Sequence, residues 1–167
     1  SLAGLRPVFD KNGAVTAGNA STLNDGASAV LIAEAEFAKA QGWEVLATIE
    51  DYCTSGVEPA RVMSAPIPAV KMLLERNELD VLDVDVYEHN EAFASASCAV
   101  AQEIGIPDDR FNLHGGAVSL GHPLGASGTR CLITMLGVMR RLEANSGIVT
   151  LCLGGGNAVA MYVRRPS

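Results

Sequence analysis

The end of the chain contains two apolar runs separated by three consecutive glycines. The first run spans residues 148–153, the second spans residues 158–163, and Gly154-Gly155-Gly156-Asn157 lies between them. Apolar segments that flank a glycine-rich turn are typical of a β-hairpin, in which glycine and asparagine supply positive φ angles. We therefore predict that the chain closes with a tight hairpin.

Upstream of this hairpin, strand-like and helix-like segments alternate. The apolar and β-branched residues predict strands at 29–33, 45–53 and 84–87. Helical spacing predicts a short helix at 34–41, one opened by Pro66 and Pro68, one over 93–104 ended by Gly105 and Pro107, and one after Gly128. The alternation predicts an α/β layered fold with a mixed sheet, and a domain boundary near residues 55–63.

Composition limits the possible partners. The 167 residues carry a net charge of −7 and no run rich in Lys or Arg, so we expect neither nucleic acid nor membrane as a partner. Four cysteines without a C-x-x-C pair indicate free thiols in a reducing, intracellular setting, the cytoplasm or an organelle. The spacing of the three histidines predicts no metal site.

Polar residues cluster where a predicted strand leads into a helix, in His89-Asn90-Glu91-Ala92-Phe93-Ala94. Side chains at such a transition can point into a cleft at the end of a sheet. The same residues also fit helix capping, with Asn90 as the N-cap and Glu91 favoured by the helix dipole.

A histidine lies inside a glycine-rich run, HGGAVSLGHPLGASG, at residues 114–128. His122 is flanked by Gly121 and Pro123, and its near-neutral pKa range suits proton transfer. A loop histidine that hydrogen-bonds to backbone is the alternative. The run matches neither the G-x-G-x-x-G dinucleotide fingerprint nor the G-x-S-x-G nucleophile elbow.

A cysteine ends the first apolar run of the hairpin. The glycines after Cys152 let a substrate approach the backbone, and their N–H groups could stabilise an oxyanion or favour a thiolate. A buried core cysteine beside a turn is the alternative. Cys98 and Cys131 lie in helical patterns, so we predict core positions for both.

Together these segments resemble the thiolase family. The shared blocks are N-E-A-F-A, G-G-A-x-x-L-G-H-P-x-G-A-S-G and C-x-G-G-G, at Asn90–Ala94, Gly115–Gly128 and Cys152–Gly156. The upstream TAGNAS and NDGA stretches, at residues 16–21 and 24–27, are also similar to thiolase sequences. Departures from the common pattern are His89 for leucine or alanine, His114 for asparagine and Ala158 for glycine.

The resemblance implies the thiolase-type layered fold, with two similar α/β halves that each contain a mixed five-stranded sheet. Residues 1–55 would be the incomplete end of the N-terminal domain, and residues 63–167 the complete C-terminal domain. On this division the acyl-accepting cysteine would lie on a missing N-terminal part, and this chain alone would be inactive.

The resemblance also implies a reversible Claisen exchange of acetyl-CoA and acetoacetyl-CoA, or thiolysis of a 3-ketoacyl-CoA, with an acyl-enzyme intermediate. Cys152 would move the α-proton. His122 would activate the acyl-accepting cysteine and contribute to one oxyanion hole, where Asn90 would position a water. The N–H of Gly154 would serve the second oxyanion hole.

For binding, the resemblance implies that Ser21 contacts the pantetheine arm of CoA and that Phe93 lines the acyl pocket. Acyl-CoA and CoA would be substrate and product, with no separate cofactor. The expected protein partner is a thiolase N-terminal half or subunit in a homo- or hetero-oligomer. A non-catalytic thiolase-fold module for assembly or acyl-CoA binding is the alternative.

Overall fold

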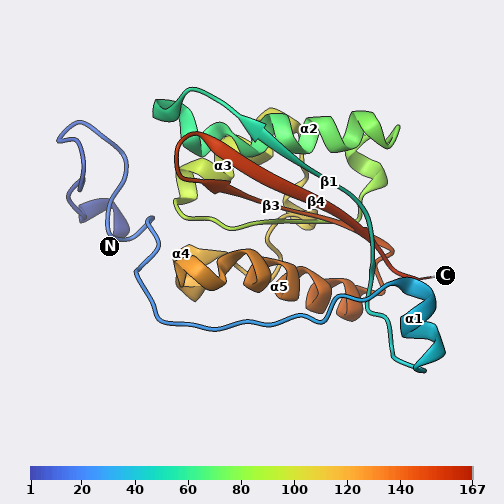
Figure 1. Ribbon diagram of the computed structural model, residues 1–167. Helices are drawn as coiled ribbons and strands as arrows, with labels where there is room; N and C mark the ends of the chain where they lie inside the picture. The colour runs from blue at the N-terminus through green and yellow to red at the C-terminus, as the bar shows by residue number, and fades with distance from the viewer. Residues whose placement is uncertain (167) are drawn as a thin grey trace.

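The computed structural model describes residues 1–166 and contains a mixed sheet with helices on both faces (Figure 1). The strands are β1 (Thr48–Gly56), β2 (Val86–His89), β3 (Ser146–Leu153) and β4 (Asn157–Arg164). The helices are α1 (Ala35–Ala40), α2 (Pro66–Arg76), α3 (Ala94–Ile104), α4 (Ala117–Leu120) and α5 (Ser127–Leu142). Short 3-10 turns lie at Leu2–Gly4, Pro59–Ser64, Val81–Asp83, Asp108–Arg110 and Leu124–Ala126.

The strand order across the sheet is β1-β4-β3-β2. β2 runs parallel to β3, whereas β4 is antiparallel to both β1 and β3. The predicted α/β layered fold with a mixed sheet is thus confirmed. Within the described residues the sheet has four strands, where the family resemblance implied five.

Successive strand residues alternate between two hydrophobic cores, one on each face of the sheet. Ile148 and Tyr162 belong to the core that includes α2 and α3, while their neighbours Val149 and Val163 belong to the core formed with α5 (Figure 1). Because both faces are covered, the strands appear in the sequence as nearly continuous apolar runs.

Helix α5 approaches the sheet closely at Gly147. A β-carbon at this position would lie 2.7 Å from the sulfur of Met135 and 3.0 Å from that of Met139. Both methionines are buried. Cys131 and Val138 belong to the same buried face of α5.

Local signals at the helix ends and the hairpin agree with the structure. Helix α2 begins at Pro66, and α3 ends before Gly105, which has a φ of 84°. In the hairpin, Gly155 and Gly156 take positive φ angles of 84° and 93°. Asn157 was expected to share this conformation but instead begins β4.

The strand predicted at residues 29–33 is absent. This segment is extended but pairs with no strand of the described chain, and Leu31 and Ile32 are 77% and 67% exposed. An apolar run becomes a strand only when a neighbouring strand accepts its hydrogen bonds. The strand predicted at 45–53 exists as β1, shifted to Thr48–Gly56 and paired with β4, so residues 48–55 lie in the same sheet as the C-terminal hairpin.

Within residues 1–166, no helix has the length and apolar character that crossing a membrane would require.

Candidate active site

The candidate site lies at one edge of the sheet, where β2 and β3 end. Because these strands are parallel, their carboxyl ends lie at the same edge. Asn90 directly follows β2 and donates its backbone N–H to the carbonyl of Thr150 at 3.2 Å. Cys152 lies two residues beyond Thr150 on β3, so the fold brings Asn90 and Cys152 to the same edge.

The segment over residues 20–24 connects the two polar loops at this edge. The backbone N–H of Ser21 donates to the carbonyl of Ala92 at 2.9 Å, and Ala20 forms an isolated bridge with Phe93. The backbone N–H of His122 donates to the carbonyl of Thr22 at 3.1 Å. Ser21 and Phe93 are therefore fixed, by backbone contacts, next to the loops that carry Asn90 and His122.

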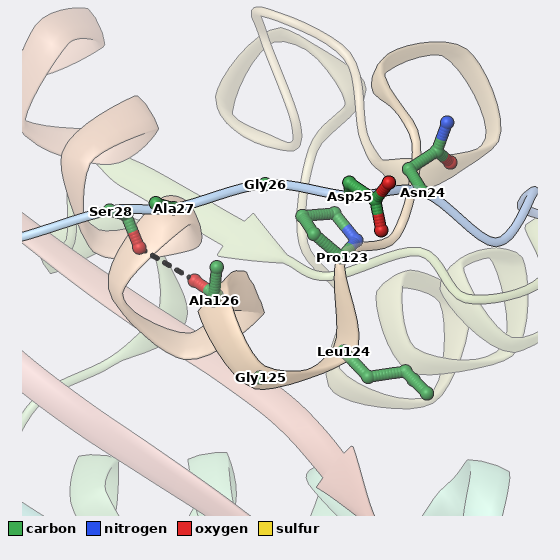
Figure 2. Close-up of a pocket in the computed structure, with 9 residues that line it drawn as sticks. All are labelled: Asn24, Asp25, Gly26, Ala27, Ser28, Pro123, Leu124, Gly125 and Ala126. Atoms are coloured by element: carbon green, nitrogen blue, oxygen red, sulfur yellow. Dashed lines mark hydrogen bonds between the residues drawn. The ribbon is translucent and has the colours of Figure 1, made fainter.

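The continuation of this segment borders a hollow of about 300 Å³ (Figure 2). Residues 24–28 line one side and residues 123–126 the other. The hydroxyl of Ser28 donates to the carbonyl of Ala126 at 2.9 Å and joins the two sides. One side of the hollow begins at Pro123, the residue that follows His122 in the sequence.

Asn90 and His122 face each other. The Nδ2 atom of Asn90 lies 3.4 Å from the Nε2 atom of His122. Asn90 is 2% exposed, and the N-cap of α3 is Phe93. The capping interpretation of Asn90 is therefore wrong, because its side chain reaches across to the glycine-rich loop.

The hydrogen bonds of Ser127 define the proton position on His122. The Ser127 hydroxyl donates to the carbonyl of Pro123 at 2.9 Å, so it accepts from Nδ1 of His122 at 2.6 Å. Nδ1 then carries the proton, and Nε2 has a free lone pair toward Asn90. Burial, and next the charge of Arg130, lower the pKa of His122. At neutral pH this ring is a proton acceptor.

Two residues that the sequence did not single out complete the network. Arg130 donates from Nη2 to Oδ1 of Asn90 at 2.9 Å and from Nη1 to Oε1 of Glu88 at 3.2 Å. Burial raises the pKa of Glu88, and the adjoining guanidinium of Arg130 opposes this shift and favours the charged carboxylate. Each residue carried a local signal: Glu88 lies in a fully buried strand, and Arg130 is a cation in the first turn of a helix, where the dipole disfavours it.

Cys152 and Gly154 lie on the hairpin side of the site. The Sγ atom of Cys152 is 3.8 Å from Sδ of Met63 and is half-buried. Burial raises the pKa of the Cys152 thiol, opposite to the thiolate that the glycine turn led us to expect. Gly154 is exposed in the turn.

The remaining cysteines differ in environment. Cys131 is buried, as predicted, and burial raises its pKa to about 12. Cys98 is exposed on α3, so the core prediction for it was wrong. The helical pattern alone did not distinguish Cys98 from Cys131. In the structure Ser97 and Val100 lie on the buried face of α3, whereas Cys98 lies on its exposed face.

Comparison with known proteins identifies the family. The model of the thiolase C-terminal domain matches residues 43–165, and that of the thiolase N-terminal domain matches residues 1–36. The chain belongs to the thiolase family. Acetyl-CoA acetyltransferases of Cupriavidus necator and Escherichia coli are 48% and 46% identical to this thiolase chain over 165 residues, 99% of its length.

Solved thiolases have the same fold. The Bacillus anthracis acetyl-CoA acetyltransferase superposes with a TM-score of 0.95 at 40% identity, over 99% of this chain. Human mitochondrial 3-ketoacyl-CoA thiolase, solved in complex with CoA, superposes with a TM-score of 0.89 at 33% identity, over 98% of this chain. The chain spans 42% of the length of each of these relatives and structures.

Proposed function

We propose that this chain supplies the proton-transfer and oxyanion-binding side of a thiolase reaction. The reaction is the reversible Claisen condensation of two acetyl-CoA molecules to acetoacetyl-CoA, or thiolysis of a 3-ketoacyl-CoA. The observation that carries the proposal is the pairing of Asn90 Nδ2 with the lone-pair nitrogen of His122, at 3.4 Å. In this arrangement His122 can act as the base toward a thiol of the reaction. After it has taken the proton, the same nitrogen is a hydrogen-bond donor.

Carbon–carbon bond formation requires loss of an α-proton from one acetyl-CoA. In the proposal Cys152 takes this proton, and the thioester oxygen gains negative charge, which the N–H of Gly154 helps to stabilise. The enolate carbon attacks the acyl group on the acceptor cysteine, whose sulfur leaves. His122, protonated when it activated that sulfur, presents Nε2–H to the negative oxygen, and Asn90 holds a water there.

The reverse direction uses the same groups. During thiolysis the carbon–carbon bond breaks, and the departing α-carbon needs a proton. Burial raises the pKa of Cys152 and so favours its protonated thiol, which is the form that can donate. The raised pKa therefore fits Cys152 as an acid in thiolysis and as a base only when substrate or assembly lowers it.

We also propose that the acyl-accepting cysteine belongs to a thiolase N-terminal half or subunit. Among residues 1–166 no cysteine sulfur hydrogen-bonds to His122, although Nε2 of His122 is free to accept a proton. The exposed apolar residues of the segment 29–33 support such a partner, because a neighbouring chain would cover them. CoA is substrate and product, no separate cofactor is needed, and the assembly is an intracellular oligomer.

The test uses acetyl-CoA labelled in the acetyl group. The purified chain is incubated alone and then with a thiolase N-terminal half from the same source. We expect no covalent label on this chain and no cleavage of acetoacetyl-CoA until the second half is present. Label bound to Cys53, Cys98, Cys131 or Cys152, or turnover by the chain alone, would contradict the division of roles. An assembly that binds acyl-CoA without turnover would favour the non-catalytic module.

A further inference from the structure

A partly buried arginine links the Asn90 loop to a buried carboxylate of the sheet. Arg130 lies in the first turn of α5, and its guanidinium holds Glu88 through Nη1 and Asn90 through Nη2. The side chain of Glu88 is 0% exposed and that of Arg130 is 17% exposed. One planar group therefore joins Glu88 in β2 to Asn90, the first residue after that strand.

The orientation of the Asn90 amide follows from this contact. Its Oδ1 atom accepts from Arg130 at 2.9 Å and lies 3.6 Å from the thiol of Cys131. Both neighbours are donors, so this end of the amide must be the oxygen. The NH2 end consequently faces His122, where it requires an acceptor, and only an unprotonated Nε2 can supply one.

We propose that Arg130 is a positioning residue that fixes the Asn90 amide and thereby, together with Ser127, holds His122 in the Nδ1–H tautomer. The inference rests on the proposed function, because it concerns the same histidine. It adds a residue to the site and gives it a separable role: Arg130 touches neither substrate nor the reacting atoms, and acts through Asn90.

Glu88 has a supporting part in this arrangement. A cation in the first turn of a helix is opposed by the helix dipole, and a partly buried one also loses hydration. Glu88 offsets both costs and anchors the Nη1 side of the guanidinium, so that Nη2 points at Asn90. The other titratable groups around the network are Glu91, Cys131 and His122 itself.

Loss of Arg130 has a defined consequence for His122. Without the guanidinium the Asn90 amide can turn, and its oxygen then accepts from Nε2–H. The Ser127 hydroxyl then turns from the carbonyl of Pro123 to donate to Nδ1, and the Nε2–H tautomer becomes favourable. The pKa of His122 rises because a nearby positive charge is gone. A residue that merely fills space would change neither property.

The experiment is nitrogen-15 NMR of the histidines in the full chain, in which long-range proton–nitrogen couplings report tautomer and titration. His122 is assigned by comparison with His122→Gln. We expect the Nδ1–H pattern in the wild type, and a shift toward Nε2–H with a raised pKa in Arg130→Met. Arg76→Met is the matched control, since Arg76 pairs with Asp51 at 2.8 Å in a 50% exposed position, and it should leave His122 unchanged.

Arg130→Met leaves the buried carboxylate of Glu88 without its partner, and this loss could unfold the variant. The double variant Glu88→Gln with Arg130→Met is therefore measured as well. It leaves no unpaired carboxylate and should show the same tautomer shift. An unchanged tautomer and pKa of His122 in the folded variants would overturn the inference.

Activity gives an independent readout in the enzyme assembled with an N-terminal half. Arg130→Met should lower kcat by about tenfold to a hundredfold with little change in KM, because a displaced reacting group costs rate more than binding. If the NMR shift occurs while no assembly shows thiolase activity, the positioning role stands and the proposed function fails. If the wild-type assembly is active and Arg130→Met is equally active, the positioning role fails alone.

Discussion

Asn90 and His122 are 32 positions apart in the chain, and their side-chain nitrogens lie 3.4 Å apart at the edge of the sheet. Asn90 is fixed by Arg130 from α5, and His122 is fixed by Ser127 at the start of the same helix. Helix α5 thus positions both members of the pair. The predictions below test that pair and the parts of the fold around it.

The first prediction concerns His122. In the enzyme assembled with an N-terminal half, His122→Ala should lower kcat by about 10²-fold or more, because the proposed mechanism gives His122 the roles of base and oxyanion donor together. Asn90→Ala should have a smaller effect, since water can partly replace its amide. Steady-state cleavage of acetoacetyl-CoA measures both. His114→Ala, at an exposed histidine, is the control, and a wild-type rate for His122→Ala would refute the assignment.

Ser127 should contribute to stability as well as to the site. Ser127→Ala leaves Nδ1–H of His122 and the carbonyl of Pro123 without their partner, in a residue that is 0% exposed. The free energy of unfolding should fall by about 1–3 kcal/mol. Denaturant unfolding is compared with Ser119→Ala, in which an exposed hydroxyl loses its bond to the carbonyl of Gly116. Equal stability of the two variants would argue against the buried contact.

His89 should make the fold sensitive to acid. Its ring is 1% exposed, stacks on Phe111, and hydrogen-bonds through Nδ1 to Ser97 at 2.7 Å. Burial lowers its pKa from 6.5 to about 4. Between these pH values the unfolded chain binds a proton that the folded chain does not, so stability is retained above pH 6.5 and falls as the pH approaches 4.

The expected loss through His89 is about 3 kcal/mol between pH 7 and pH 4. His89→Leu should remove this part of the acid sensitivity, whatever its stability at pH 7. Unfolding free energies are measured across this range, and His114→Leu, at an exposed histidine, serves as the control. Identical pH slopes for the wild type and His89→Leu would show that the buried ring does not resist protonation.

The hairpin offers a matched pair of glycine substitutions. Gly156 has a φ of 93°, and a β-carbon there would overlap the carbonyl oxygen of Val57, whereas nothing lies within 4 Å of the same position at Gly154. Gly156→Ala should lower the free energy of unfolding by about 2 kcal/mol or more. Gly154→Ala keeps the backbone N–H, and its free energy of unfolding should be close to that of the wild type. A Gly156→Ala protein with wild-type stability would mean that the turn relaxes freely.

Cysteine labelling tests the environments of the thiols. Cys98 is exposed on α3, while burial raises the pKa of Cys53, Cys131 and Cys152. Brief treatment of the folded chain with iodoacetamide should therefore modify Cys98 first, because the thiolate is the reactive form and must be reached by reagent. Peptide mass mapping gives the order. Faster labelling of Cys152 would indicate that the amides of the glycine turn outweigh its burial.

Local chemistry explains what could be predicted from the sequence. Pro66 at a helix start, Gly105 at a helix end and the glycines of the hairpin each impose a backbone conformation on their neighbours. The corresponding elements lie where the sequence predicted them. The segment at 29–33 has strand composition and forms no strand, because pairing depends on a second segment and not on composition alone.

By itself, the sequence determined the alternation of elements, the hairpin and the thiolase motifs that carry Asn90, His122 and Cys152. The tertiary structure decided the orientation of those groups: which end of the Asn90 amide faces His122, and that burial opposes a thiolate at Cys152. The tertiary structure also decided the pairing of Arg130 with Glu88. Short-range conformational preferences are encoded residue by residue, whereas hydrogen-bond partners and desolvation arise only when distant segments pack together.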